Sequence, residues 1–441
     1  MSTVAPDRTP QPPDPSSGPG GAAAPAAAPV KQRAWKYPVV YSVLALASLL
    51  VFGLLAGGGK QTTFTFASRN DFFTIPPLPV PSKATCVALG LVLVVLAAVS
   101  IWATFTRRRL GVWFPLLFGI VFVFAFLTWS AAGAGRMPVT ALLAGALALS
   151  VPLIFGAMCG LVGERSGIIN IAIEGQLLAG AFLAAVVASA LQNPYAGLFA
   201  APIAGALVAV VLTFFAVRYW VDQIIIGVVL NVLVVGVTSF LFSTVLTQDP
   251  ATWNARQQLP NLPIPLLSDI PVIGPVLFNQ NILVYLMYVV VVALQIFIFR
   301  SKWGLRMRAI GEHPKAADTV GINVNRNRVL NTLLAGAIAG LGGAFFTIGS
   351  GLAFGKEMSA GQGYIALAAM ILGKWNPMGA LFAALLFGFS KNLANVLSAI
   401  GTPVPSQLLL MLPYVVTVLA VAGFVGRVRA PAAEGKPYIS Q

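Results

Sequence analysis

Long apolar runs recur along this chain of 441 residues and constrain its fold more than any other feature. Hydrophobic residues make up 58% of the sequence and charged residues only 9%, whereas ordinary globular domains carry about 25% charged residues. A helix needs roughly 20 apolar residues to cross the hydrocarbon layer of a membrane, which is ~30 Å thick. The sequence therefore predicts an all-α, polytopic integral membrane protein with about 10–12 transmembrane helices.

The apolar runs divide the chain into regions. Residues 1–36 are rich in Pro, Ala, Gly and Ser, so we expect a disordered cytoplasmic tail. N-terminal transmembrane helices follow over 37–131, then a core domain over 139–425 with an inward loop at 300–329, then a second cytoplasmic tail at 426–441. The expected spans are 37–58, 84–105, 110–131, 139–161, 168–191, 196–217, 224–246, 282–299, 330–349, 378–398 and 407–425.

The apolar run at 364–373 is too short for a full crossing. We predict a half-span or re-entrant helix there, which leaves ten or eleven true crossings as alternatives to twelve.

Lysine and arginine indicate the orientation of the chain. When the amino terminus is placed in the cytoplasm, 20 of the 27 basic residues lie in inside segments and 7 in outside segments. Cytoplasmic loops of membrane proteins carry such an excess, so both termini are expected to be cytoplasmic. This pattern also accounts for the net charge of +15, and no basic tract interleaved with aromatic residues suggests a nucleic-acid partner.

The residue inventory argues against chemistry on this chain. His313 is the only histidine, which removes Ser/His/Asp and Cys/His catalysis and any multi-histidine metal site. Cys86 and Cys159 both lie in apolar runs, where a disulfide framework is not expected. We therefore predict no catalytic residue and no metal ligand.

The "GGGK" stretch at residues 57–60 invites comparison with an ATP-binding P-loop. That motif needs a glycine six residues before the lysine and a serine or threonine after it. Leu54 and Gln61 occupy those positions, so no ATP site is predicted on this chain.

The inward loop reads "RSKWGLRMRAIGEHPKAADTVGINVNRNRV". Pro314 suits the first position of a helix, and Gly321 suits the left-handed residue that ends one. A helix over 314–320 is too short to be stable alone, so it is suited to dock into a partner. An ordinary solvated basic loop is the alternative interpretation.

Polar residues inside the spans are the candidates for a solute pathway. If a span begins near Ile168, Asn170 and Glu174 share one helical face, with Gln176 close by. An ionised carboxylate facing lipid would cost about 2.5–3.5 kcal/mol, so Glu174 should face other helices or water. Pathway and helix packing are equal alternatives for this pair, while Glu164 and Arg165 are expected at the cytoplasmic boundary.

Further pathway candidates are amide and aromatic residues, namely Asn231, Gln362, Trp375, Asn376 and the pair Asn392 and Asn395. Asparagine and tryptophan near turns also serve as helix caps and interfacial anchors. Gly336 and Gly340 form a G-x-x-x-G pattern that favours close helix packing.

Three motifs carry a resemblance to a known family. "KAADTVG" is similar to the EAA-x-x-x-G loop of ATP-driven importer permeases, with Lys315 in place of the glutamate. "GLRMRAIGEHPKAADTVGINV", "GERSGIINIAIEGQLLAGAF" and "GQGYIALAAMILGKWNPMGA" resemble the bacterial ABC permeases of branched-chain amino-acid, ribose and nucleoside importers, and most of all the nucleoside branch linked to basic membrane proteins. The similarity covers roughly residues 139–425.

The resemblance implies a type II ABC importer-like permease in a bacterial inner or plasma membrane, working by alternating access and performing no bond chemistry. Its partners would be a cytoplasmic ATPase that binds ATP and Mg, a second homologous permease or a second copy, and an extracytoplasmic solute-binding protein. The solute would be a nucleoside or a related small polar molecule. The residues that would couple to the ATPase are Gly311, Glu312, His313, Pro314, Lys315, Ala316, Ala317, Asp318 and Gly321.

An ion-coupled secondary transporter is the alternative interpretation. Such a protein would favour several buried ionisable residues as ion sites, and Glu174 is the only acid expected deep in a span.

Overall fold

The computed structural model describes residues 35–54, 58–66, 71–108, 110–111, 113–133, 136–402, 405, 407–408, 411 and 430–439. Most of the predicted amino-terminal tail and most of the predicted span 407–425 lie outside the described residues.

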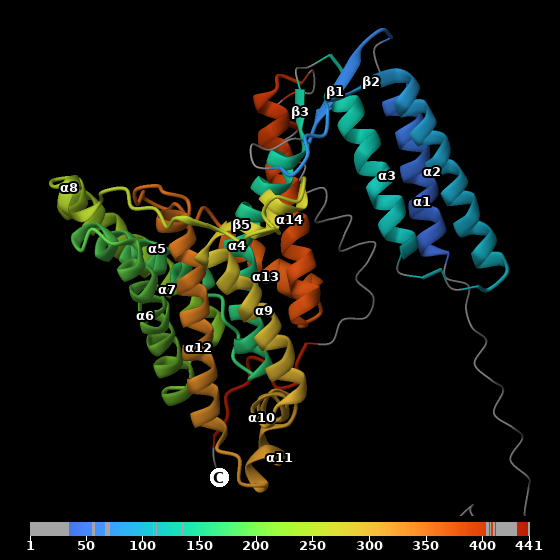
Figure 1. The fold of residues 1–441 in the computed structure, drawn as a ribbon. Coiled ribbons are helices and arrows are strands. Elements are labelled where there is room, and N and C mark those ends of the chain that lie inside the picture. The colour runs from blue at the N-terminus through green and yellow to red at the C-terminus, as the bar shows by residue number, and fades with distance from the viewer. Residues whose placement is uncertain are drawn as a thin grey trace, which may run out of the picture.

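Ten helices in the described part are long and apolar enough to cross a membrane, which confirms the predicted polytopic all-α fold (Figure 1). Several of them end in a π-helical segment, and the bounds of each span include that segment. The spans are α1 with its extension (Lys36–Leu54), α2 (Ser82–Phe105), α3 (Trp113–Ser130), α4 (Val139–Arg165), α5 (Ile173–Ala190), α6 (Pro194–Arg218), α7 (Gln223–Leu246), α9 (Ile282–Arg300), α12 (Val324–Gly349) and α14 (Pro377–Ala399).

Shorter elements complete the described fold. The helices are α8 (Pro250–Trp253), α10 (Lys302–Glu312), α11 (Pro314–Thr319) and α13 (Gln362–Leu372), with a π-helical turn at Gly274–Phe278. The strands are β1 (Gln61–Thr65), β2 (Leu78–Pro81), β3 (Arg136–Pro138), β4 (Asn261–Pro263) and β5 (Asn279–Asn281). The 11 residues of α13 extend about 16 Å, half the thickness of a membrane, so the prediction of a helix too short for a full crossing is confirmed.

Asparagine and aspartate side chains start several helices. Asp222 accepts hydrogen bonds from the amides of Ile224 and Ile225 at the start of α7, and Asn281 accepts from Val284 at the start of α9. A carboxylate or amide oxygen at this position satisfies amides that have no partner inside the helix.

The spans form two bundles (Figure 1). Helices α1, α2 and α3 pack on one another beside the core, and a small sheet in the order β2-β1-β3 joins them to it at one end. Strand β1 pairs antiparallel with β2 and parallel with β3, which leads directly into α4. Figure 1 shows α10 and α11 at the opposite end of the core from this sheet.

The core is built around α4, α5, α6 and α12, which pack closely through small residues. A Cβ added at Gly336 would collide with the carbonyl of Gly205, and one at Gly340 would collide with the carbonyl of Ala201. The predicted packing role of this G-x-x-x-G pattern is therefore confirmed.

Candidate coupling and translocation sites

Helix α5 begins later than predicted. Helix α4 runs to Arg165, and residues 166–172 form an irregular segment before α5 starts at Ile173. The break follows Gly167, whose φ of 88° cannot continue a helix. The predicted helical face shared by Asn170 and Glu174 is therefore wrong, because Asn170 lies outside any helix.

Glu174 instead caps the start of α13. Its carboxylate accepts hydrogen bonds from the Ser359 hydroxyl at 2.6 Å, the Gly361 amide at 2.8 Å and the Gly363 amide at 2.6 Å. A carboxylate is stabilised at a helix amino terminus, where free amides and the helix dipole both favour negative charge. The residue that precedes α13 is a glycine and offers no side-chain cap, so Glu174 ties two broken helices together inside the bundle.

Asn170 and Gln176 lie together on the other side of this break. The Asn170 Nδ2 donates to Gln176 Oε1 at 3.0 Å and to the sulfur of Cys159 at 3.1 Å. Both side chains are fully buried, while Asn170 Oδ1 and Gln176 Nε2 meet no hydrogen-bond partner among the described residues. A buried amide oxygen and a buried amide nitrogen are thus left with free bonding capacity.

Asn231 of α7 holds the irregular start of α5. Its Oδ1 accepts from the Gly175 amide at 2.8 Å, and its Nδ2 donates to the Ile171 carbonyl at 3.0 Å and the Tyr364 hydroxyl at 3.1 Å. One side chain therefore connects α7, α5 and α13. Gln362, the first residue of α13, is also buried at this level. We call Asn170, Glu174, Gln176, Asn231 and Gln362 the polar centre.

Trp375 and Asn376 do not belong to the polar centre, because α13 separates them from Glu174 by about 16 Å. Asn376 caps α14 by accepting from the amides of Met378 and Gly379. The Trp375 indole donates to Glu164 Oε2 at 2.6 Å, and the Trp375 carbonyl accepts from Arg165 Nη2 at 2.7 Å. Asn392 similarly donates to the Leu142 carbonyl at 2.8 Å and packs α14 on α4.

Glu164 and Arg165 are not the solvated boundary charges that the sequence predicts. Glu164 is only 3% exposed, and Arg165 lies over the ring of Phe299. The α13–α14 turn folds back under the end of α4 and covers them, which a count of spans along the sequence does not reveal.

The predicted short helix after Pro314 is confirmed as α11, and Gly321 follows it with a φ of 83°. Ala317 is buried, whereas Lys315, Ala316 and Val320 are exposed. Helix α10 precedes α11 and was not predicted. It is amphipathic, with Met307 and Ile310 buried and Leu305 exposed.

Interrupted helices that meet at a buried polar site are typical of membrane transporters. Residues 142–421 match the family model described as a branched-chain amino acid transport system permease component. The chain belongs to this family of ABC permeases. It is the permease component of an ABC importer, and the ion-coupled alternative is not favoured.

Individual relatives agree with this assignment. The permease is 38% identical over 305 residues to the guanosine ABC transporter permease protein NupQ of Bacillus subtilis, covering 66% of this chain and 94% of that protein. It is 38% identical over 307 residues to the nucleoside ABC transporter permease protein NupC of Lactococcus lactis, covering 68% and 96%. The guanosine permease protein NupP of B. subtilis is 28% identical over 261 residues, covering 58% and 72%. No solved structure matches the chain.

Several contacts of the permease were not foreseen from its sequence. Ser359, Gly361 and Gly363, which bind Glu174, stand next to or within the "GQGYIAL" motif, so the motif itself was the signal. The burial of Glu164 and the docking of residues 430–439 left no such signal, because both depend on contacts between distant segments.

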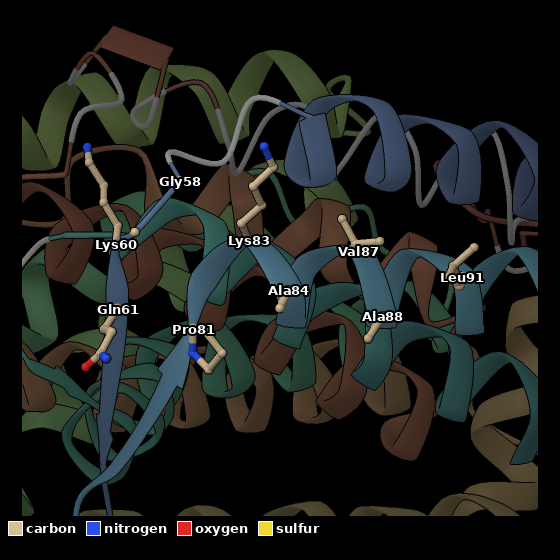
Figure 2. Close-up of a pocket in the computed structure, with 10 residues that line it drawn as sticks. Gly58, Lys60, Gln61, Pro81, Lys83, Ala84, Val87, Ala88 and Leu91 are labelled. Carbon is tan, nitrogen blue, oxygen red and sulfur yellow. The ribbon is translucent and has the colours of Figure 1, made fainter.

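A pocket of about 690 Å³ lies outside the permease core, at the "GGGK" stretch. Figure 2 shows Lys60, just before β1, and Lys83, at the start of α2, extending to one side, while Gln61 and Pro81 point the other way. The cavity is lined by α2 and does not reach the polar centre. Among the described residues, no group of three His, Cys, Asp or Glu side chains could hold a metal ion.

Proposed function

We propose that this permease imports nucleosides or related ribosyl solutes. The observation that carries the proposal is the 38% identity to a guanosine permease and a nucleoside permease over nearly their whole lengths. The chemistry of the polar centre supports it, since amide and carboxylate groups suit a solute that has several hydroxyls and ring nitrogens.

ATP hydrolysis takes place on a separate cytoplasmic ATPase, which binds ATP and Mg. Helices α10 and α11 dock into it, with Lys315, Ala316 and Val320 as the exposed contact residues and the buried Ala317 anchoring α11 to the permease. This end of the bundle is then cytoplasmic, and both termini lie on that side, which agrees with the distribution of lysine and arginine.

A second homologous permease completes the pathway. Two B. subtilis guanosine permease proteins both resemble this chain, which favours a pair of different permeases over two identical copies. An extracytoplasmic solute-binding protein delivers the solute to the opposite end, where the sheet and α8 lie.

Transport requires the polar centre to open toward each side in turn, since its residues are buried in this conformation. When α13 moves away from α5, Asn170 and Gln176 are free to bind a solute with the polar atoms that have no partner among the described residues.

Competition in proteoliposomes that hold the whole complex tests the substrate. ATP-dependent uptake of labelled guanosine should be suppressed by excess unlabelled nucleosides, and much less by ribose or branched-chain amino acids. Suppression by ribose alone would instead indicate that the permease transports sugars.

A loop replacement tests the docking of α11. Replacing residues 314–320 with a Gly/Ser linker should abolish uptake, while the solute-binding protein still docks on the opposite face. Ser243→Ala is the matched control, because Ser243 is exposed, lies in α7 outside the replaced segment, and its hydroxyl bonds to the Ser239 carbonyl of the same helix. Unchanged uptake with the linker would refute the coupling assignment.

A further inference from the structure

The described carboxy-terminal segment, residues 430–439, lies against both α10 and α11. The Ala433 amide donates to the Gly311 carbonyl at 2.8 Å, at the end of α10. The Tyr438 hydroxyl donates to Asp318 Oδ2 at 2.6 Å, in α11. The Tyr438 ring is only 8% exposed and packs with Ile310 and Ala317. The segment therefore contacts both α10 and α11, the helices assigned to ATPase docking.

The same segment also contacts the membrane core. The Gly435 amide donates to the Gly167 carbonyl at 3.3 Å, and the Lys436 carbonyl accepts from Arg328 Nη1 at 2.9 Å. Gly435 has a φ of 72°, and a Cβ there would lie 2.7 Å from the side chain of Ile169. A glycine at position 435 therefore allows the backbone to approach the 166–172 turn closely.

Arg328 makes the contact with α12 specific. Its side chain is 2% exposed at the start of α12, and a buried cation is costly unless it is hydrogen-bonded. Its Nε and Nη2 atoms meet no acceptor among the described residues, so the Lys436 carbonyl is the acceptor that holds it. Removing the segment would leave this buried cation without that bond.

The turn that the segment contacts leads directly into the polar centre. Three residues beyond Gly167 lies Asn170, which binds Gln176, and the next residue, Ile171, is held by Asn231 through its carbonyl. A displacement of α11 that is carried by residues 430–439 would therefore reach the irregular start of α5 through a short series of hydrogen bonds.

We propose that residues 430–439 are a mechanical link that transmits movement of α10 and α11 to the 166–172 turn, with Tyr438 as the positioning residue at the α11 end. Residues 430–439 stay bound to α10, α11 and the 166–172 turn during the transport cycle, so the turn moves together with the docked helices. This inference rests on the proposed docking of the ATPase at α11.

The test uses the full reconstituted complex and measures ATP hydrolysis, uptake and co-purification of the subunits together. The probe is radiolabelled guanosine, or the labelled nucleoside that the wild-type complex takes up fastest. Tyr438→Phe removes one hydroxyl and keeps the packed ring. We expect assembly and ATP hydrolysis to stay within about twofold of wild type, while uptake per ATP falls at least threefold.

Further variants separate the link from simple stability. A chain ended after Arg429 should lower uptake per ATP more than Tyr438→Phe does. Asp318→Asn keeps an acceptor oxygen and should lose less, and Tyr438→Phe combined with Asp318→Asn should lose no more than Tyr438→Phe alone. Ile439→Ala is the matched control, because Ile439 is 59% exposed.

The outcomes divide cleanly. If uptake per ATP is unchanged in both Tyr438→Phe and the shortened chain, or if only assembly falls, the link is refuted. Failure of the proposed function is distinct, because it would show as ATP-independent uptake in the wild-type complex or as full uptake with the 314–320 linker.

Discussion

Two buried glutamates contact the two ends of α13, and they differ in their hydrogen-bond partners. Glu174 at the start accepts three hydrogen bonds, two of them from backbone amides. Glu164 at the far end accepts one from the Trp375 indole and has a second carboxyl, Glu434, beside it. At the start of α13 backbone amides thus hold the carboxylate, whereas at its end side chains make the contact, since Arg165 also donates to the Trp375 carbonyl at 2.7 Å and 3.1 Å. We infer that the two ends respond differently to the loss of a carboxylate.

The largest effect is expected from Glu174→Gln. The amide keeps one acceptor oxygen but turns an NH2 group toward backbone donors, so at least one buried amide of α13 loses its partner. This should lower the free energy of unfolding by about 1–3 kcal/mol. Labelled nucleoside uptake should fall at least tenfold, more than subunit co-purification does. Equal losses of uptake and assembly would favour packing as the role of Glu174.

Trp375→Phe should have an intermediate effect at the other end. The substitution keeps an aromatic ring but removes the donor to Glu164, at a cost of about 1–3 kcal/mol for a buried acceptor left without a partner. Thermal unfolding can be followed with a thiol-reactive dye, because Cys86 and Cys159 are both buried and neither forms a disulfide.

The double variant Trp375→Phe with Glu164→Leu sharpens this test. It should unfold at a higher temperature than Trp375→Phe alone, because the carboxyl that lost the indole donor is gone and only Glu434 stays at this contact. A purely additive loss would contradict the assigned hydrogen bond.

Glu164→Gln should change stability little, in contrast to the same substitution at position 174. The amide oxygen can still accept from the Trp375 indole, and the amide nitrogen can still donate to the Glu434 carboxyl that pairs with Glu164. We expect a change within about 1 kcal/mol of wild type in the dye assay. A loss as large as that of Glu174→Gln would erase the distinction between the two ends of α13.

The contrast also shows what the sequence could predict. Apolar runs located ten spans and the half-span α13, because the length of a crossing is set by the membrane itself. Pro314 and Gly321 located α11, because both residues fix the backbone locally. The prediction that Glu174 shares a helical face with Asn170 was wrong, since the break at 166–172 depends on Asn231 and Gly363 from distant helices. Local periodicity carries no information about such contacts.

The smallest effect is expected at Glu434, and it depends on pH. Burial raises the pKa of this carboxyl above its ordinary value of 4.5. The docked state of residues 430–439 therefore binds the proton more tightly than the released state. The contribution of the Glu434 carboxyl to docking is fully present below about pH 4.5 and is lost as pH rises through the raised pKa.

Hydrogen exchange at the amides of Ala433 and Gly435 reports this docking, because Ala433 donates to the Gly311 carbonyl of α10 and Gly435 to the Gly167 carbonyl of the 166–172 turn. After correction for intrinsic rates, exchange in the wild-type permease should speed up as pH rises from about 5 to about 8. In Glu434→Gln it should stay constant, because the amide cannot titrate. The same pH dependence in both proteins would assign the effect to another group. A constant rate in the variant would assign the pH dependence of this contact to Glu434 together with the Glu164 carboxyl that it pairs with.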